Sequence, residues 1–227
     1  MRQSIALLLL AILAYLPGWW VRRVLDEHGR VDSYGISGAQ AARRFLDRVG
    51  LRDVKVEVGA PAGDHYDPLS RTVRLAPERM QARSLSAIVV AAHEVGHAMQ
   101  HHAGEAAFGL RTELAKLAVT LQRAGVVSII AAPLLALVSR SPLVLGAALG
   151  VGVLGFLLAM LVHLVTLPVE LDASFGKALP LLEAGDELKA GDHRRARRIL
   201  RAAAFTYVGA AGLALLAVGR WGGLLRR

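Results

Sequence analysis

The sequence predicts a mainly α-helical integral membrane protein with about four transmembrane helices and a small antiparallel β-sheet. Of its 227 residues, 54% are hydrophobic, which is more than an ordinary soluble domain contains. Several apolar stretches are long enough to cross the hydrocarbon core of a bilayer, which is about 30 Å thick. The polar stretches between them include short alternating patterns that are typical of strands.

Three apolar regions divide the chain. Residues 1–21 are predicted to be an N-terminal transmembrane anchor, because the apolar run ends in tryptophans and arginines; a cleaved signal peptide is the alternative. Residues 124–169 are predicted to form a transmembrane hairpin around a tight turn at 139–142, with a buried soluble hairpin as the alternative. Residues 202–227 are predicted to be a C-terminal transmembrane helix with a basic tail.

Two polar sections, residues 22–123 and 170–201, are predicted to share one face of the membrane, because two spans separate them. Most of the 27 Lys and Arg residues lie in these sections, so the positive-inside rule favours a cytoplasmic location for this face. We interpret the net charge of +9 as membrane topology and attraction to lipid headgroups. No motif that combines aromatic and basic residues indicates nucleic-acid binding.

The first polar section contains signals for a helix and a sheet. Ser37 and Gln40 form a capping-box pattern, which predicts a helix that ends near Gly50. The alternation at 54–58 and the run at 72–75 predict two strands. A further helix, which Ser84 or Ser86 caps and Gly104 ends, should follow directly.

That further helix carries the motif H-E-V-G-H at residues 93–97, within an apolar, alanine-rich run. His93 and His97 are spaced i and i+4, so they lie on one helix face about 6 Å apart along the axis. Both imidazoles can then reach one Zn²⁺ at about 2.0–2.1 Å. Glu94 lies beside them and is suited to take a proton from a water that the metal activates.

An ordinary helix with two histidines and a glutamate is the alternative explanation of this motif. We favour a metal site, because these groups are costly in so apolar a stretch unless something binds them. The chain has no cysteine, which excludes disulfides and thiolate ligands. The ligands must therefore be His, Glu or Asp side chains.

A catalytic zinc needs a third protein ligand, and Glu170 is the best downstream candidate. It follows the predicted hairpin on the same membrane face as the motif. The alternative is that Glu170 binds no metal and is a carboxylate at a helix end in the membrane interface. His101 is a rival candidate. Ligands at i, i+4 and i+8 would spread over about 12 Å of a straight helix, so we expect His101 to lie behind the ligands or in solvent.

Taken together, these motifs resemble the bacterial membrane-bound neutral zinc metallopeptidases of the YugP type. The matching pieces span nearly the whole chain in the expected order: Ser37-Gly38-Ala39, residues 64–68 with 72–75, residues 91–98, Leu167-Pro168-Val169-Glu170, and Thr206-Tyr207-Val208. More distantly, the sequence is similar to HtpX-type membrane proteases. These carry an aspartate four residues after the ligand glutamate, where this chain has Ser174. Asp172 is a possible substitute for that aspartate as the partner of the histidines.

The resemblance implies a gluzincin plan on a zincin-like catalytic helix in residues 22–123. His93, His97 and Glu170 would be the metal ligands, and Glu94 would be the general base. The expected cofactor is Zn²⁺, and the expected location is the bacterial plasma membrane with a cytoplasmic catalytic face.

The donor that stabilises the developing oxyanion is an open question, with His65 and Tyr207 as candidates. His65 lies in the segment 64–68, which is either an Asp-Pro hairpin turn or an edge that borders the substrate cleft. In the second case an extended peptide could pair with this edge by strand addition.

The sequence thus predicts a membrane-embedded zinc endopeptidase that acts on peptides or membrane proteins within a lipid bilayer. A non-catalytic membrane scaffold with a structural or vestigial metal site is the first alternative. A metal sensor or transporter that uses His163 and Glu170 is the second. Glu94 favours the enzyme, because a purely structural metal site would not need it. The sequence does not indicate the oligomeric state.

Overall fold

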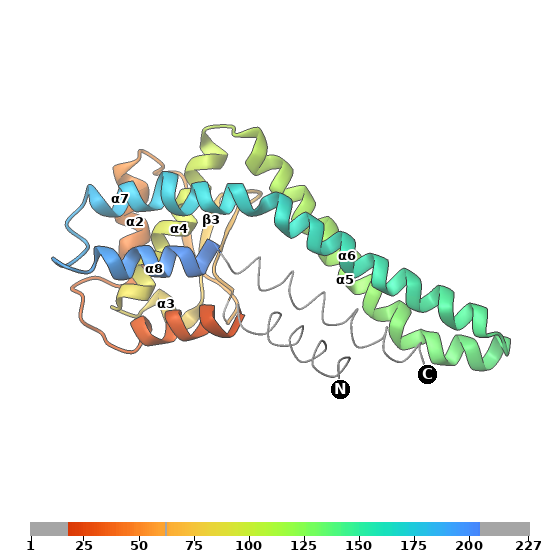
Figure 1. Ribbon diagram of the computed structural model, residues 1–227. Helices are drawn as coiled ribbons and strands as arrows, with labels where there is room; N and C mark the ends of the chain where they lie inside the picture. The colour runs from red at the N-terminus through yellow and green to blue at the C-terminus, as the bar shows by residue number, and fades with distance from the viewer. Residues whose placement is uncertain (1–17, 62, 205–227) are drawn as a thin grey trace. The chain divides into compact units, whose positions relative to one another are not determined.

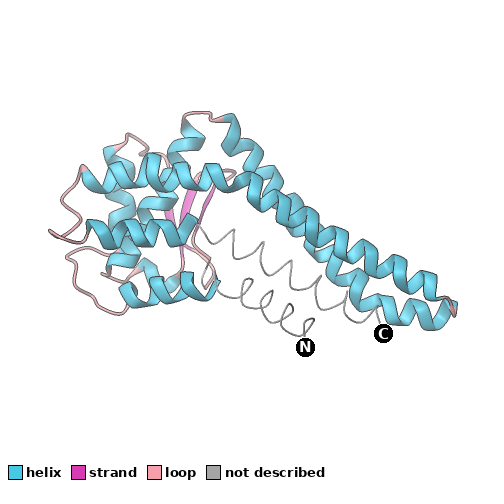
Figure 2. Ribbon diagram, in the orientation of Figure 1, coloured by secondary structure: helices cyan, strands magenta, loops and turns pink. Residues whose placement is uncertain are grey.

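The computed structural model describes residues 18–61 and 63–204, where the chain is mainly helical with one small sheet (Figures 1 and 2). The described residues form two compact units, which we treat separately. The sheet unit comprises residues 20–110 and 168–204, and the hairpin unit comprises residues 111–167. Most of the first and last predicted spans lies outside the described residues, so the number of four spans stays a prediction.

Helix α2 (Gly38–Arg48) begins at the predicted capping box of the sheet unit. The Ser37 hydroxyl accepts a hydrogen bond from Gln40 N at 3.3 Å, and the Gln40 side chain accepts one from Ser37 N at 2.9 Å. These bonds satisfy two amide groups that a helix start leaves without intrahelical partners. The helix buries Phe45 and Leu46 completely, which anchors it to the core of the unit.

The sheet has three short strands in the order β1-β3-β2: β1 (Lys55–Val58), β3 (Thr72–Leu75) and β2 (His65–Asp67). β1 runs parallel to β3, and β2 runs antiparallel to it, so the prediction of an antiparallel sheet is wrong for one of the two pairs. The reason is that β3, with three of its four residues buried, takes the centre. The segment that contains β2 therefore serves as the crossover between the parallel strands.

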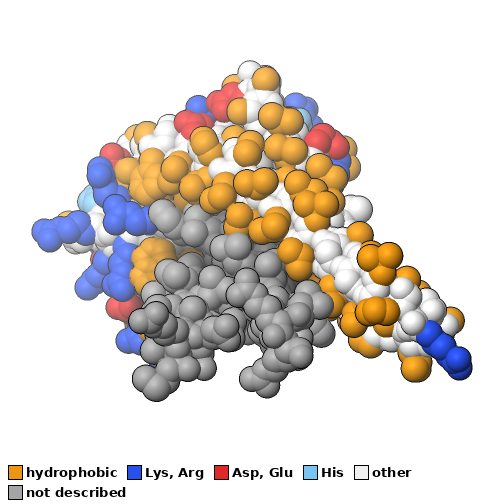
Figure 3. All heavy atoms as spheres, turned by 45° about the vertical axis from the view of Figure 1, so that its right-hand side comes forward, with side chains coloured by type: hydrophobic (Ala, Val, Ile, Leu, Met, Phe, Trp, Pro, Cys, Tyr) orange, Lys and Arg blue, Asp and Glu red, His pale blue; other side chains and the backbone are white. Residues whose placement is uncertain are grey.

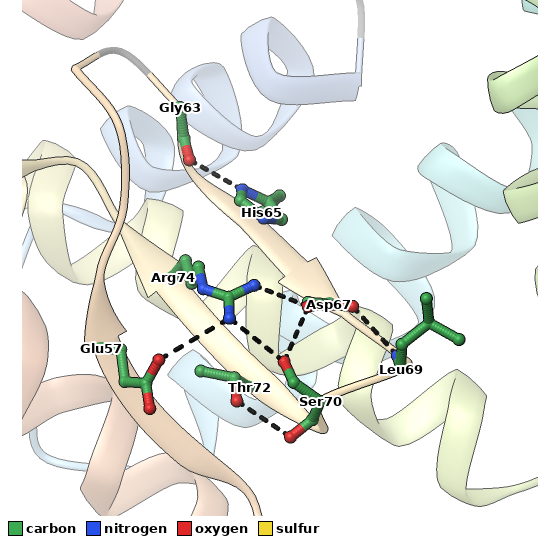
Figure 4. A network of polar contacts seen from close by, with 8 residues as sticks. All are labelled: Glu57, Gly63, His65, Asp67, Leu69, Ser70, Thr72 and Arg74. Carbon is green, nitrogen blue, oxygen red and sulfur yellow. Dashed lines mark hydrogen bonds and ion pairs between the residues drawn. The ribbon is translucent and has the colours of Figure 1, made fainter.

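Asp67 ends β2 and stabilises the turn into β3 (Figure 4). Its carboxylate accepts hydrogen bonds from Leu69 N at 3.0 Å, from Ser70 Oγ at 2.7 Å and from Arg74 at 2.6 Å. The Ser70 hydroxyl and then the Arg74 guanidinium hold the pKa of Asp67 well below its usual range. The turn lies at residues 68–71, so the Asp-Pro segment 64–68 consists mostly of strand β2 and leads into the turn.

Helix α4 (Leu85–His102) is the central element of the sheet unit, and it carries the H-E-V-G-H motif. It begins at Ser84, one of the two predicted caps, whose hydroxyl accepts a hydrogen bond from Ala87 N at 3.3 Å. Every residue from Leu85 to Ala98 is buried, because α2, the sheet and the later helices all pack on α4. A helix that is apolar on all sides requires such an interior position.

The C-terminal part of the sheet unit packs on α4. Helix α6 (Pro142–Leu171) ends in this unit, and three further helices follow: the π-helix η1 (Asp172–Ala178), α7 (Leu179–Glu183) and α8 (His193–Ala204). η1 approaches α4 so closely that a Cβ atom on Gly96 would lie 2.6 Å from Ala173 O. The end of α6 is therefore held directly beside the H-E-V-G-H motif.

The hairpin unit consists of the parts of α5 (Ala106–Ser139) and α6 that lie between residues 111 and 167. A tight turn joins them, as predicted, and Arg140 adopts a positive φ of 50° there. In the described part of the chain, two helices are long and apolar enough to cross a membrane, namely α5 and the helical stretch that begins with α6. Large hydrophobic side chains are exposed along this hairpin (Figure 3): Val127, Ile130, Leu137, Val138 and Leu143.

Small residues let the two helices of the hairpin approach each other. A Cβ atom on Gly155 would lie 2.9 Å from Leu121 O, and one on Gly152 would overlap the Ile129 side chain. Such close approach is the usual basis of helix packing within membranes. By contrast, a Cβ atom on Gly150 would meet nothing within 4 Å, so this position faces away from the contact.

We therefore expect Gly155→Leu to separate the helices, while Gly150→Leu should be tolerated. Overpacking of this kind typically costs about 1–3 kcal/mol. Thermal unfolding of the two variants in the same detergent checks this. Equal unfolding temperatures for the two variants would contradict the packing described here.

Candidate metal centre

Two helices bring three ionisable side chains together in the interior of the sheet unit. His93 and His97 come from α4, and Glu170 comes from the last turn of α6. Glu170 Oε2 lies 3.5 Å from His93 Nε2 and 3.3 Å from His97 Nε2, and the three potential ligand atoms lie within 4.8 Å of one another. Each residue is at most 5% exposed. This cluster could hold a metal ion.

The donor atoms of this cluster fit Zn²⁺. Two imidazole nitrogens and one carboxylate oxygen form a donor set typical of catalytic zinc, and they leave a fourth position for water or substrate. Tetrahedral ligands at about 2.0–2.1 Å from a zinc ion lie roughly 3.3 Å apart. The observed separations of 3.3 and 3.5 Å between carboxylate and imidazole atoms are close to that value.

Ser174 holds the imidazole of His93 from behind. Its Oγ lies 3.0 Å from His93 Nδ1, and its hydroxyl donates a hydrogen bond to Leu200 O at 3.3 Å. Because that hydroxyl hydrogen is used, the Ser174 oxygen is left to accept from His93 Nδ1–H. Ser174, which the sequence suggested as a possible partner of the histidines, is thus a direct partner of His93.

Gln100 holds the imidazole of His97 in the corresponding way. Its Oε1 lies 3.0 Å from His97 Nδ1, and its Nε2 donates to Val169 O at 3.1 Å and to Asp172 Oδ2 at 2.8 Å. Asp172 therefore reaches a histidine through Gln100 and not directly. No role for Gln100 was predicted from the sequence, although a glutamine three residues after His97 in an apolar helix was a usable signal.

Glu94 is also buried, with 6% of its surface exposed, and follows His93 directly on α4. One step along a helix is a turn of about 100°, so Glu94 leaves the helix from a face next to that of the two histidines. Burial of a carboxylate in so apolar a helix is costly unless the carboxylate is paired, hydrogen-bonded or close to a metal. Its role as general base stays a prediction.

Aromatic side chains line the other side of His97. Its ring centroid lies 5.8 Å from that of Phe108, which also contacts His101 and Tyr66. The Tyr66 hydroxyl bonds His101 Nδ1 at 2.8 Å, and burial raises the pKa of Tyr66 to about 12, so the phenol stays protonated at neutral pH. The described ligand cluster does not include His101, whose ring contacts Phe108 as the ring of His97 does.

The two candidates for the oxyanion donor are placed differently. His65 is exposed on β2, and its Nδ1 bonds Gly63 O at 2.8 Å within its own hairpin (Figure 4). Tyr66, the next residue, faces the opposite side of the strand and is buried toward α4. Tyr207 lies outside the described residues. The oxyanion role of either residue stays a prediction.

Gly96 is the contact that lets η1 approach the histidines, because a side chain there would overlap Ala173 O. We expect Gly96→Ala to push η1 away and to shift both Glu170 and Ser174. Zinc retention during purification should fall, and the free energy of unfolding should drop by about 1–3 kcal/mol. Gly109→Ala is the matched control, because a Cβ atom there meets nothing within 4 Å. Wild-type zinc retention in Gly96→Ala would contradict this role.

Comparison with known proteins identifies the class to which this fold and site belong. The model of a family described as "Putative neutral zinc metallopeptidase" matches residues 3–226. The chain belongs to this family, which confirms the resemblance inferred from the motifs.

One particular relative is the "Putative membrane protease YugP" of Bacillus subtilis (strain 168). The two sequences are 38% identical over 207 residues, which cover 89% of this chain and 87% of that protein. No solved structure matches the chain. The family supports a hydrolase that uses zinc, and the name of the relative supports a location in the membrane.

Proposed function

We propose that this protein is a membrane-embedded, zinc-dependent endopeptidase. The observation that carries the proposal is the meeting of His93, His97 and Glu170 in one buried cluster on the H-E-V-G-H helix. Membership of the zinc metallopeptidase family supports the same chemistry. His93, His97 and Glu170 would hold Zn²⁺, and Glu94 would act as the general base.

The chain's own residues would divide the reaction between them. When bound, Zn²⁺ would polarise the scissile carbonyl and lower the pKa of the attacking water. Glu94 would take the proton of that water and later deliver it to the leaving amine. Ser174 and Gln100 would keep the imidazoles oriented, each through a bond to Nδ1. His65 and Tyr207 remain our candidates for the oxyanion donor.

A peptide or a membrane protein is the proposed substrate, bound in extended form. β2 is an edge strand of the sheet, and Tyr66 links it to α4 through His101. An extended peptide could add to this edge by main-chain hydrogen bonds, close to the helix of the motif. We propose no nucleic-acid partner.

The protein would be anchored in the plasma membrane with its catalytic unit in the cytoplasm. Two apolar helices and the name of the relative support the membrane. Residues 20–110 and 168–204, which lie before and after the hairpin in the sequence, fold into one compact unit, which supports their placement on the same side. The concentration of Lys and Arg in these sections favours the cytoplasm.

A non-catalytic scaffold and an enzyme differ in their need for Glu94. We expect Glu94→Gln to retain zinc and to lose cleavage of an unfolded or membrane-associated test substrate by roughly 10²–10⁴-fold, because the base is removed while the ligands stay. His93→Ala should lose both zinc and cleavage. Metal analysis and proteolysis assays on purified protein check this.

Glu113→Gln is the matched control for this experiment, since Glu113 is exposed, pairs with Lys116 on α5 and belongs to the hairpin unit. It should cleave like the wild type. Undiminished cleavage by Glu94→Gln would refute the mechanism. A zinc-loaded wild type that cleaves no substrate would support the scaffold.

A further inference from the structure

A histidine that binds a metal through Nε2 must carry its proton on Nδ1, and the partner of Nδ1 decides whether it does. The partner of His97 Nδ1 is the side-chain amide of Gln100, 3.0 Å away. An amide can present either its oxygen or its NH₂ group to a ring nitrogen. The orientation of the Gln100 amide therefore determines the tautomer of His97.

Two acceptors fix the orientation of this amide. The NH₂ group of Gln100 donates to Val169 O at 3.1 Å and to Asp172 Oδ2 at 2.8 Å. A flipped amide would place its oxygen against a backbone carbonyl and a carboxylate, neither of which has a hydrogen to donate. Gln100 is 0% exposed, so water could not replace the lost donor. Such a flip would therefore leave buried acceptors without a hydrogen bond, which is costly. The amide oxygen must therefore face His97.

The acceptor Asp172 is itself held by charged neighbours. Lys177 lies 3.5 Å from Asp172 Oδ2 and 2.9 Å from Glu105 Oε1. The hydrogen bond to Glu105, followed by the nearby carboxylates, raises the pKa of Lys177, so its ammonium group stays charged. A continuous chain of polar contacts thus leads from the partly exposed Glu105 and Lys177 through Asp172 and Gln100 to the buried His97.

His93 is held by a separate device. Its Nδ1 faces Ser174, whose hydroxyl is directed to Leu200 O and not to any member of the Gln100 chain. The two histidines therefore have independent partners, although both partners leave Nε2 directed at Glu170. This independence lets one histidine be disturbed while the other serves as an internal control.

We propose that Gln100 is a positioning residue that fixes the Nδ1–H tautomer of His97, and that Asp172 acts on the metal site by orienting the Gln100 amide. The proposal rests on the zinc site proposed above. It assigns Asp172 a role through hydrogen bonding and not through its charge. Gln100→Met, which has a similar size and no amide, should weaken zinc binding by about 10–100-fold.

Variants of Asp172 test the role of the Gln100 amide orientation without altering the buried core, because the Asp172 side chain is 42% exposed. Asp172→Ala removes one of the two acceptors and should weaken zinc binding in the same direction as Gln100→Met. Asp172→Asn keeps an acceptor oxygen and should bind zinc like the wild type. Competition with a chromogenic chelator gives the dissociation constants, and circular dichroism verifies folding.

A second readout follows each histidine separately. In zinc-loaded protein with ¹⁵N-labelled histidine, the Nδ1–H of His97 should exchange slowly with solvent in the wild type and in Asp172→Asn, and quickly in Gln100→Met and Asp172→Ala. Ser174→Ala should instead speed exchange at His93 and leave His97 unchanged.

Three results would overturn the proposal. The first is that Gln100→Met binds zinc as tightly as the wild type and still exchanges the Nδ1–H of His97 slowly. Asp172→Asn could weaken binding as much as Asp172→Ala, which would show that charge matters and not amide orientation. A folded wild type that binds no zinc would remove the proposed function as well, so the two failures are distinguishable.

Discussion

Burial of a carboxylate between two imidazoles is the constraint on which the rest of the sheet unit depends. Glu170 is 1% exposed in a core of alanine, valine and leucine, where an ionised carboxylate is costly unless it is paired or binds a metal. The imidazoles of His93 and His97, with Nε2 atoms within 3.5 Å, are its neighbours. Such a cluster is maintained only if the surrounding elements hold these side chains in place.

The frame that holds the cluster is built from α4 and η1. Gly96 allows the two helices to touch. The change from α-helix to π-helix comes at Asp172, two residues after Glu170. π-helical segments of this kind are often found at functional sites. η1 then supplies Ser174 to one histidine and, through Gln100, Asp172 to the other. The short helix η1 therefore contributes to the orientation of both imidazoles, and it begins just after Glu170 in the chain.

The sequence was sufficient for those features that rest on local spacing. The i, i+4 histidines, the caps Ser37 and Ser84, and the turn at Arg140 all follow from patterns within a few residues. Features that depend on packing between distant segments were not predictable. β3 lies at the centre of the sheet, so one strand pair is parallel. The amide of Gln100 is oriented by contacts with residues about 70 positions away in the sequence.

The central claim is that His93, His97 and Glu170 are ligands of one zinc ion, and anomalous diffraction at the zinc absorption edge tests it most directly. Crystals of the zinc-loaded protein should show a single strong anomalous peak about 2.0–2.1 Å from the Nε2 atoms of both histidines and about 2.0–2.2 Å from a carboxylate oxygen of Glu170. A peak bound by other side chains such as His101, or no peak at this cluster, would contradict the account.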